Sequence, residues 1–202
     1  MEPKFSKSNI SVTDIVNTKN CSYCNKPFTE KLWCKKCINS LEKSAENGNK
    51  VAIFNLAKRY YNGEGTEKNL EKAFYWYHKA AEKGDIYAMN YLANRYYYGE
   101  GTEKNLEKAF YWYQKAAKNG DKEAMNYLAN RYYYGEGTEK NLEKAFYWYQ
   151  KAAKNGDKEA MNYLANRYYY GEGTEKNLEK AFYWYQKAAE NGNIYAMNYL
   201  AN

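Results

Sequence analysis

Apolar side chains recur at helical spacing along this chain, in a pattern that starts again every 36 residues. Within residues 86–98, Ala88, Leu92 and Tyr96 lie four positions apart, which predicts a helix with one buried face. Gly99 follows at the place where a left-handed glycine commonly ends a helix. We call this predicted segment helix A.

A second apolar stripe lies between residues 105 and 118 and predicts a helix that we call helix B. Asn105 is a good N-cap residue, and Glu107 in the first turn complements the positive end of the helix dipole. The predicted buried face of helix B consists of Leu106, Ala109, Phe110, Trp112, Tyr113, Ala116 and Ala117. Gly120 ends this helix, and Asp121 is placed to cap the next helix A.

The phrase GEGTEKNLEKAFYWY occurs four times, beginning at Gly63, Gly99, Gly135 and Gly171. A unit of this size is one helix pair, which can bury its apolar face only by stacking on its neighbours. The sequence therefore predicts an all-α fold, a right-handed α-solenoid of helix-turn-helix repeats with a period of 36 residues. Copying of one unit also accounts for the 26 Tyr and 5 Trp, which we interpret as core residues.

Three segments are expected before and around the repeats. Residues 1–18 are polar and predict a disordered leader, and residues 19–37 contain all the cysteines. Residues 38–49 align with the end of a repeat, so we expect them to form a solitary helix B that caps the array. The predicted repeats are 50–85, 86–121, 122–157, 158–193 and a partial repeat at 194–202.

The four cysteines, Cys21, Cys24, Cys34 and Cys37, form two CxxC pairs separated by nine residues. Two such pairs supply the four thiolates of a tetrahedral structural zinc site, and leave no open position for a Lewis-acid role. We therefore predict a Zn²⁺ ion in a short zinc ribbon or knuckle, with disulfides or free thiols as the alternative. Because Cys37 falls at the start of the solitary helix B, the metal is expected to hold this cap in place.

One unit closely resembles the Sel-1-like repeat, in the pattern A-x3-LA-x2-Y-x2-G-x-G-T-x2-N-x3-A-x2-WY-x2-AA-x2-G. The matching residues are Ala88, Leu92, Ala93, Tyr96, Gly99, Gly101, Thr102, Asn105, Ala109, Trp112, Tyr113, Ala116, Ala117 and Gly120. The resemblance covers about residues 50–202 and implies a tetratricopeptide-like α-solenoid that acts as a non-catalytic adaptor. Cysteine-rich bacterial relatives carry a disulfide in each repeat, whereas no repeat here contains a cysteine.

The same resemblance implies a concave groove lined by helix A residues that do not face the core. Its first position is Tyr87, which becomes Glu123 and Glu159 in the following repeats. The other predicted partner-binding residues are Asn90, Asn94, Tyr97, Asn126, Asn130, Tyr133, Asn162, Asn166 and Tyr169. A ladder of Asn amides offers donors and acceptors to the backbone of an extended peptide, and Tyr adds amphipathic contact area. The alternative is a solvated polar face that repetition has made uniform.

The net charge of +7 does not predict a nucleic-acid partner. The unit at residues 86–121 has five basic and four acidic side chains, a net charge of +1, and the excess elsewhere is scattered. No apolar stretch is long enough for a signal peptide or a membrane span, so we expect a cytoplasmic chain, with the nucleus as the alternative. The only histidine, His78, stands where later units have Gln, which predicts an exposed helix position rather than a base.

The sequence thus favours a scaffold that binds a protein or an extended peptide in the groove. The alternative is that the zinc ribbon recognises nucleic acid or ubiquitin, with the repeats as a spacer. At the other end, the chain stops at Asn202 within a fifth helix A. Phe182, Trp184 and Tyr185 are then expected to lack a complete neighbour, and end-to-end self-association through this edge is a further prediction.

Overall fold

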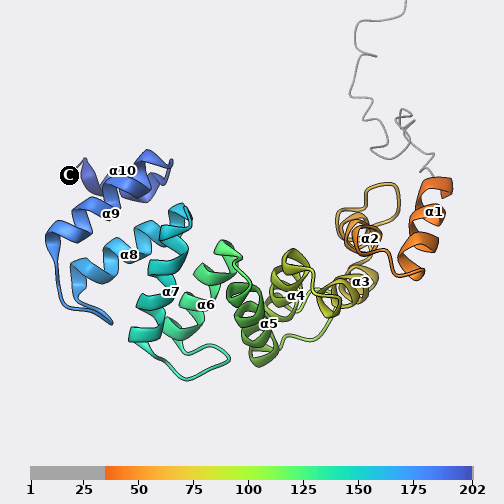
Figure 1. Ribbon diagram of the computed structural model, residues 1–202, viewed down its shortest axis with the longest axis horizontal. Helices are drawn as coiled ribbons and strands as arrows, with labels where there is room; N and C mark the ends of the chain where they lie inside the picture. The colour runs from red at the N-terminus through yellow and green to blue at the C-terminus, as the bar shows by residue number, and fades with distance from the viewer. Residues whose placement is uncertain (1–34, 202) are drawn as a thin grey trace, which may run out of the picture.

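The computed structural model describes residues 35–201, which form ten helices and no strand, arranged in an open arc (Figure 1). The helices are α1 (Lys35–Glu46), α2 (Lys50–Asn62), α3 (Leu70–Glu82), α4 (Ile86–Tyr98), α5 (Leu106–Lys118), α6 (Lys122–Tyr134), α7 (Leu142–Lys154), α8 (Lys158–Tyr170), α9 (Leu178–Glu190) and α10 (Ile194–Leu200). Each helix packs against the next one in the chain. The predicted helices A and B therefore alternate along an α-solenoid, and we call α2, α4, α6, α8 and α10 the A helices.

The helix ends lie where the sequence predicts them. Gly99 has φ 71° and its N–H donates to the Arg95 carbonyl, which closes α4. The Asn105 side chain accepts a hydrogen bond from the Lys108 N–H at 2.8 Å and begins α5. Asp121 does the same for α6, because its Oδ1 accepts from the Ala124 N–H at 2.7 Å.

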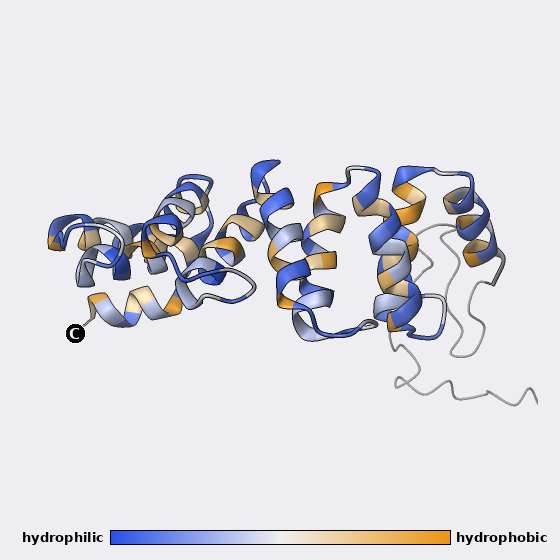
Figure 2. Cartoon of the chain, turned by 90° about the horizontal axis from the view of Figure 1, so that it is seen from below, coloured by the Kyte–Doolittle hydropathy of each residue, from blue (hydrophilic) through white to orange (hydrophobic). Residues whose placement is uncertain are grey.

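Small and aromatic side chains fill the space within and between the helix pairs. Leu92, Ala93 and Ala109 are fully buried in one pair. Between pairs, Phe110 of α5 meets Tyr132 of α6 edge to face, with ring centroids 5.2 Å apart. Apolar residues lie along the helices and the connections are mostly hydrophilic, as Figure 2 shows. Stacking of successive units therefore buries the apolar faces, as the repeat pattern predicts.

In the last three Gly-Glu-Gly turns, the second glycine lies very close to the preceding repeat. A Cβ added to Gly137 would lie 2.1 Å from the Leu106 carbonyl oxygen at the start of α5. Gly101 has the same relation to Leu70, and Gly173 to Leu142. The turn therefore carries two functions, since the first glycine ends helix A and the second lets one repeat approach the next.

The helix α1 covers the first A helix. Its Ile38 and Leu41 side chains are buried, and the Tyr60 hydroxyl of α2 donates a hydrogen bond to Glu42. Cys37 is also buried near the start of α1. The other predicted zinc ligands, Cys21, Cys24 and Cys34, lie outside the described residues, as does the predicted leader 1–18.

The last helices expose part of their apolar surface. Phe182 of α9 is 53% exposed, whereas the equivalent Phe146 is half-buried in the array. Tyr185 is nevertheless buried, because its ring stacks on Tyr199 with centroids 3.9 Å apart. Self-association through this edge stays a prediction. In residues 35–201, no helix is both long and apolar enough to cross a membrane.

Candidate functional site

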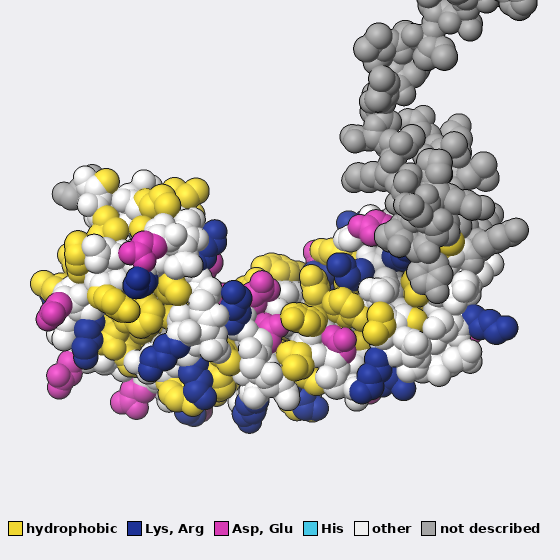
Figure 3. Space-filling model, turned by 45° about the horizontal axis from the view of Figure 1, so that its top comes forward, with side chains coloured by type: hydrophobic (Ala, Val, Ile, Leu, Met, Phe, Trp, Pro, Cys, Tyr) yellow, Lys and Arg dark blue, Asp and Glu magenta, His cyan; other side chains and the backbone are white. Residues whose placement is uncertain are grey.

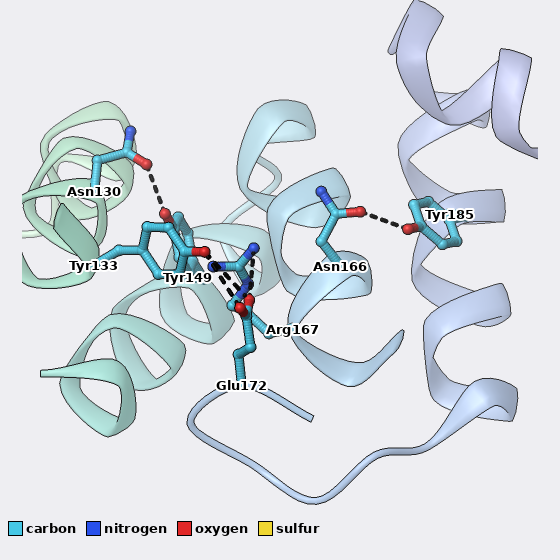
Figure 4. A network of polar contacts seen from close by, with 7 residues as sticks. All are labelled: Asn130, Tyr133, Tyr149, Asn166, Arg167, Glu172 and Tyr185. Carbon is cyan, nitrogen blue, oxygen red and sulfur yellow. Dashed lines mark hydrogen bonds and ion pairs between the residues drawn. The ribbon is translucent and has the colours of Figure 1, made fainter. Parts of the chain in front are cut away.

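The predicted groove residues all lie on A helices, and α2 and α4 lie on the inner side of the arc in Figure 1. The structure separates these residues into three groups with different surroundings. Asn94, Asn130 and Asn166 form the first group and are half-buried. Each accepts a hydrogen bond from a tyrosine of the next helix, since the hydroxyls of Tyr113, Tyr149 and Tyr185 donate to their Oδ1 atoms at 2.8, 2.6 and 2.5 Å. Two of these bonds are drawn in Figure 4.

The second group, Asn90, Asn126 and Asn162, lies one helical turn earlier and is buried. Asn90 is 5% exposed and Asn126 is 7% exposed. The Oδ1 atoms of both have no hydrogen-bond partner within the described part of the chain. Buried acceptors of this kind are rare, and both of these atoms are enclosed by protein atoms.

The third group, Tyr97, Tyr133 and Tyr169, takes part in the contacts between repeats. The guanidinium of Arg167 lies over the Tyr133 ring, with its central carbon, Cζ, 4.0 Å from the ring centroid. The Tyr133 hydroxyl donates a hydrogen bond to Glu172 at 3.4 Å. Arg167 and Glu172 form an ion pair at 3.1 Å (Figure 4). Tyr97, Arg131 and Glu136 repeat this arrangement one unit earlier.

The sequence analysis missed this arginine-centred contact. Arg95, Arg131 and Arg167 are buried, and each pairs with the glutamate of its own Gly-Glu-Gly turn. A signal was present, because Arg95 stands between the core positions Leu92 and Tyr96 and the acid follows five residues later in every copy. The repeated Glu100, Glu136 and Glu172 are therefore partners of buried arginines.

Two surface hollows lie between successive A helices. The hollow between α4 and α6 has a volume of about 420 Å³ and is lined by Tyr87, Asn90, Tyr91, Gly120, Asp121, Lys122 and Glu123. The hollow between α6 and α8 has a volume of about 410 Å³ and is lined by Lys122, Glu123, Asn126, Tyr127, Gly156, Asp157, Lys158, Glu159 and Asn191. The equivalent residues of successive repeats line both. We call them the first hollow and the second hollow.

Burial changes the titration of groups around the second hollow. It raises the pKa of Asp157, and the nearby carboxylates Glu159 and Glu123 raise it further. Burial also raises the pKa of Tyr127, with Glu123 again adding to the effect. Lys122 acts on Asp157 in the opposite direction, so acidic and basic groups meet at this hollow.

The only histidine of the chain lies on α3 and is less exposed than the sequence analysis predicts. His78 is half-buried, its Nδ1 lies 3.5 Å from Glu82, and its ring meets Trp112 edge to face. No group of three His, Cys, Asp or Glu side chains in residues 37–201 is placed to hold a metal ion. The A helices present polar and aromatic side chains in a regular series.

Comparison with known proteins gives one family model and several solved structures. The Sel1 repeat model matches residues 50–85, 86–121, 122–157 and 158–193. A protective antigen present in uropathogenic Escherichia coli strains, which displays an SLR fold, has a TM-score of 0.78 and 34% sequence identity, over 81% of this chain and 35% of that one. A Sel1 repeat protein from Oxalobacter formigenes has a TM-score of 0.74 and 37% identity, over 80% and 64% of the two chains.

Cysteine rich protein B of Helicobacter pylori is more distant, with a TM-score of 0.53 and 27% identity over 65% of this chain and 94% of that one. No curated protein matches the sequence. The chain spans about a third of the antigen and less than two-thirds of the Oxalobacter protein.

Proposed function

Because the chain belongs to the Sel1 repeat family, we propose that it is a non-catalytic scaffold that binds an extended segment of a partner protein across its A helices. The observation that carries this proposal is the recurrence of one hollow at successive repeats, each lined by a buried asparagine amide. An extended chain also presents equivalent groups at regular intervals, so a regular series of hollows matches it better than it matches a compact ligand.

The surroundings of the asparagines refine the proposal. The Oδ1 atoms of Asn94, Asn130 and Asn166 are already bonded to tyrosines within the array. The Oδ1 atoms of Asn90 and Asn126 have no such bond and are enclosed by protein atoms. These amides are therefore the ones able to turn toward a ligand without breaking a hydrogen bond, whereas the amides of the other group orient the tyrosines. We therefore assign direct contact with a partner to Asn90, Asn126 and the residues around them.

Site-specific photocrosslinking tests the proposed face. A benzophenone amino acid replaces Tyr87, which lines the first hollow and is 67% exposed, or Tyr111, which lies on α5 and is 49% exposed. Both replacements exchange one exposed aromatic side chain for another. We expect the probe at Tyr87 to capture a small set of proteins from cell extract, at low and at high salt, and the probe at Tyr111 to capture none of them.

Capture of the same proteins from both positions, or from Tyr111 alone, would contradict binding across the A helices. Captured nucleic acid that is lost as salt rises would instead support the zinc-ribbon alternative, because phosphate contacts weaken steeply with salt.

A further inference from the structure

The two hollows are built by nearly identical repeats and differ at very few positions. The units 86–121 and 122–157 differ only at their first two residues, Ile86-Tyr87 in one and Lys122-Glu123 in the other. Tyr87 lines the first hollow, and Glu123, its counterpart one repeat later, lines the second. The difference between the units is therefore located at the hollows. Where the first hollow has the aromatic ring of Tyr87, the second has the carboxylate of Glu123.

Acidic side chains outnumber basic ones in the lining of the second hollow. Three carboxylates line it, from Glu123, Asp157 and Glu159. The two lysines at its rim are engaged with backbone carbonyls, since Lys122 Nζ donates to the Gly156 oxygen at 3.3 Å and Lys158 Nζ to the Gly192 oxygen at 3.4 Å. Two lysines offset two of the three carboxylates, so the lining carries a net formal charge of −1.

The carboxylates also retain free acceptor positions. Glu159 accepts one hydrogen bond, from Asn193 Nδ2 at 2.7 Å, and Asp157 accepts one from the Ala160 N–H at 2.7 Å. The carboxylate of Glu123 has no hydrogen-bond or ion-pair partner within residues 37–201. Each carboxylate can accept several hydrogen bonds, so unused acceptors remain around the hollow.

The wall of the same hollow contains a polar group whose hydrogen bonding is incomplete. Asn126 lines it, is 7% exposed, and has a buried Oδ1 atom without a partner among the described residues. A small turn of this amide toward the hollow would let a donor from a ligand complete its bonding. Because no three of the carboxylates are placed to hold a metal ion within the described residues, a cationic organic group matches the hollow better than a metal ion does.

A lysine ammonium or an arginine guanidinium meets these requirements. Both are cations with three or five N–H donors and no acceptor, and they bond carboxylates more strongly than neutral donors do. The half-buried ring of Tyr127 also lines the hollow and offers a cation–π contact. We propose that the second hollow binds the side chain of a lysine or arginine carried by an extended segment of the partner protein. This inference rests on the proposed function, because it names the side chain that the A-helix face selects.

Defined peptides test the inference on the full chain of 202 residues. Labelled pools of short peptides are randomised at all positions but one, which is fixed as Arg, Lys, citrulline, Ala, Glu or Phe, and binding is followed by fluorescence polarisation. Citrulline keeps the shape of arginine without its charge. At about 0.15 M salt we expect the Arg and Lys pools to bind about fivefold more tightly than the citrulline and Ala pools, as one or two partly exposed ion pairs would give.

Matched double variants locate the preference. Glu123→Gln with Glu159→Gln removes two charges from the hollow, and Glu143→Gln with Glu179→Gln removes two charges from α7 and α9. All four residues lie in the first turn of a helix, so the cost to the helix dipole is the same. We expect the first pair to abolish the preference for Arg and Lys, and the second pair to retain it. Because Glu123 and Glu159 raise the pKa of the buried Asp157, the first pair should melt no lower than the second at neutral pH.

The remaining outcomes overturn the inference in distinguishable ways. Binding of all pools with equal affinity, or tightest binding of the Phe pool, would reject a basic subsite but leave a peptide-binding face. A preference for Arg that survives Glu123→Gln with Glu159→Gln would place the basic side chain elsewhere. If no pool binds, the subsite and the proposed binding of extended segments both fail.

Discussion

Tyr149 and Tyr77 occupy the same position in two repeats but differ in their hydrogen bonds. The Tyr149 hydroxyl donates to Asn130 at 2.6 Å, whereas the Tyr77 hydroxyl is buried without a partner in the described chain. The reason is local, because Lys58 stands in the first repeat where Asn130 stands in the third. The same Tyr→Phe substitution at these two equivalent positions can therefore show how much the hydrogen bond to asparagine contributes.

We expect Tyr149→Phe to lower the free energy of unfolding by about 1 kcal/mol, since it removes one hydrogen bond and leaves the Asn130 acceptor half-buried. Tyr77→Phe should leave stability unchanged or raise it, because it removes a buried hydroxyl that bonds nothing. Urea unfolding followed by circular dichroism measures both. Equal losses in the two variants would show that the bond to asparagine contributes nothing.

At the scale of the helix and its turn, Gly137 and Gly156 share a backbone conformation and differ in surroundings. Their φ angles are 73° and 81°, so any other residue is strained at both. A Cβ at Gly137 would meet the Leu106 carbonyl, whereas a Cβ at Gly156 would have no atom within 4 Å. We expect Gly156→Ala to cost about 1 kcal/mol and Gly137→Ala about 3 kcal/mol or more, because the second also forces two repeats apart. Thermal melting of the two variants measures both losses of stability. Equal losses would mean that the packing of the repeats does not depend on this close approach.

The N-cap of α8 gives a prediction about pH. Burial raises the pKa of Asp157, and a carboxyl with a raised pKa in the folded state binds more protons folded than unfolded. Its contribution to stability is therefore present below the ordinary aspartate pKa of about 4 and is lost as the pH rises through the folded-state value. Asp157→Asn should raise the melting temperature at neutral pH and have little effect near pH 3, since Asn is an equally good cap.

The last junction of the array already has an asparagine at the equivalent position. Asn193 caps α10 and donates to Glu159 at 2.7 Å, so the amide introduced by Asp157→Asn would be placed to do the same toward Glu123. A melting temperature that Asp157→Asn leaves unchanged at neutral pH would contradict a cost from the buried carboxylate. Asp121→Asn, at the preceding junction, is the matched comparison, because burial raises the pKa of that group as well.

The elements also show what the sequence could predict and what it could not. Helix bounds followed from Gly99, Asn105 and Asp121, because caps and left-handed glycines act within a few residues of the chain. The surroundings of Asn90 and Asn94 did not follow. Helical spacing placed both on one face, but it does not say that the Asn90 side chain is buried or that Asn94 bonds Tyr113. Those facts depend on how closely successive helices approach, which periodicity alone leaves open.

At the scale of the whole molecule, the junctions between repeats are interchangeable. Deletion of residues 122–157 joins Asp121 to Lys158. The new junction has the same Asp-Lys sequence as the native junction between Asp121 and Lys122. We expect this variant to fold with the same helicity per residue and a melting temperature lower by a few degrees, because one repeat and one interface are lost. Circular dichroism melting measures this. The same deletion removes the second hollow and keeps the first, so it should also abolish the preference for basic peptides.

A half-unit deletion serves as the contrast. Removal of residues 122–139 places α5 directly before α7, two helices of the B type in succession. This variant should lose its cooperative melting. If the deletion of a whole unit is equally disruptive, the repeats are not equivalent and the array has a preferred order.

The N-terminal end gives the last prediction at this scale. We propose that Cys21, Cys24, Cys34 and Cys37 bind a structural zinc ion that fixes the start of α1, the helix that covers α2. Cys37 is buried at that place. A chelator should then lower the melting temperature of the array, and a Cys21→Ser, Cys24→Ser variant should melt at the lower temperature with or without chelator. A melt that does not change with chelator would contradict the metal-held cap.

The surface of the arc mixes hydrophobic side chains with basic and acidic ones, and it is hollowed between the last helices and the middle of the array (Figure 3). The units 86–121 and 122–157 differ only at two neighbouring positions, and those positions lie at the hollows. Their side chains contribute little to the core, the caps or the arginine contacts. Substitution there can change ligand preference at almost no cost in folding, so an array of this kind can acquire new specificities one repeat at a time while its architecture stays fixed.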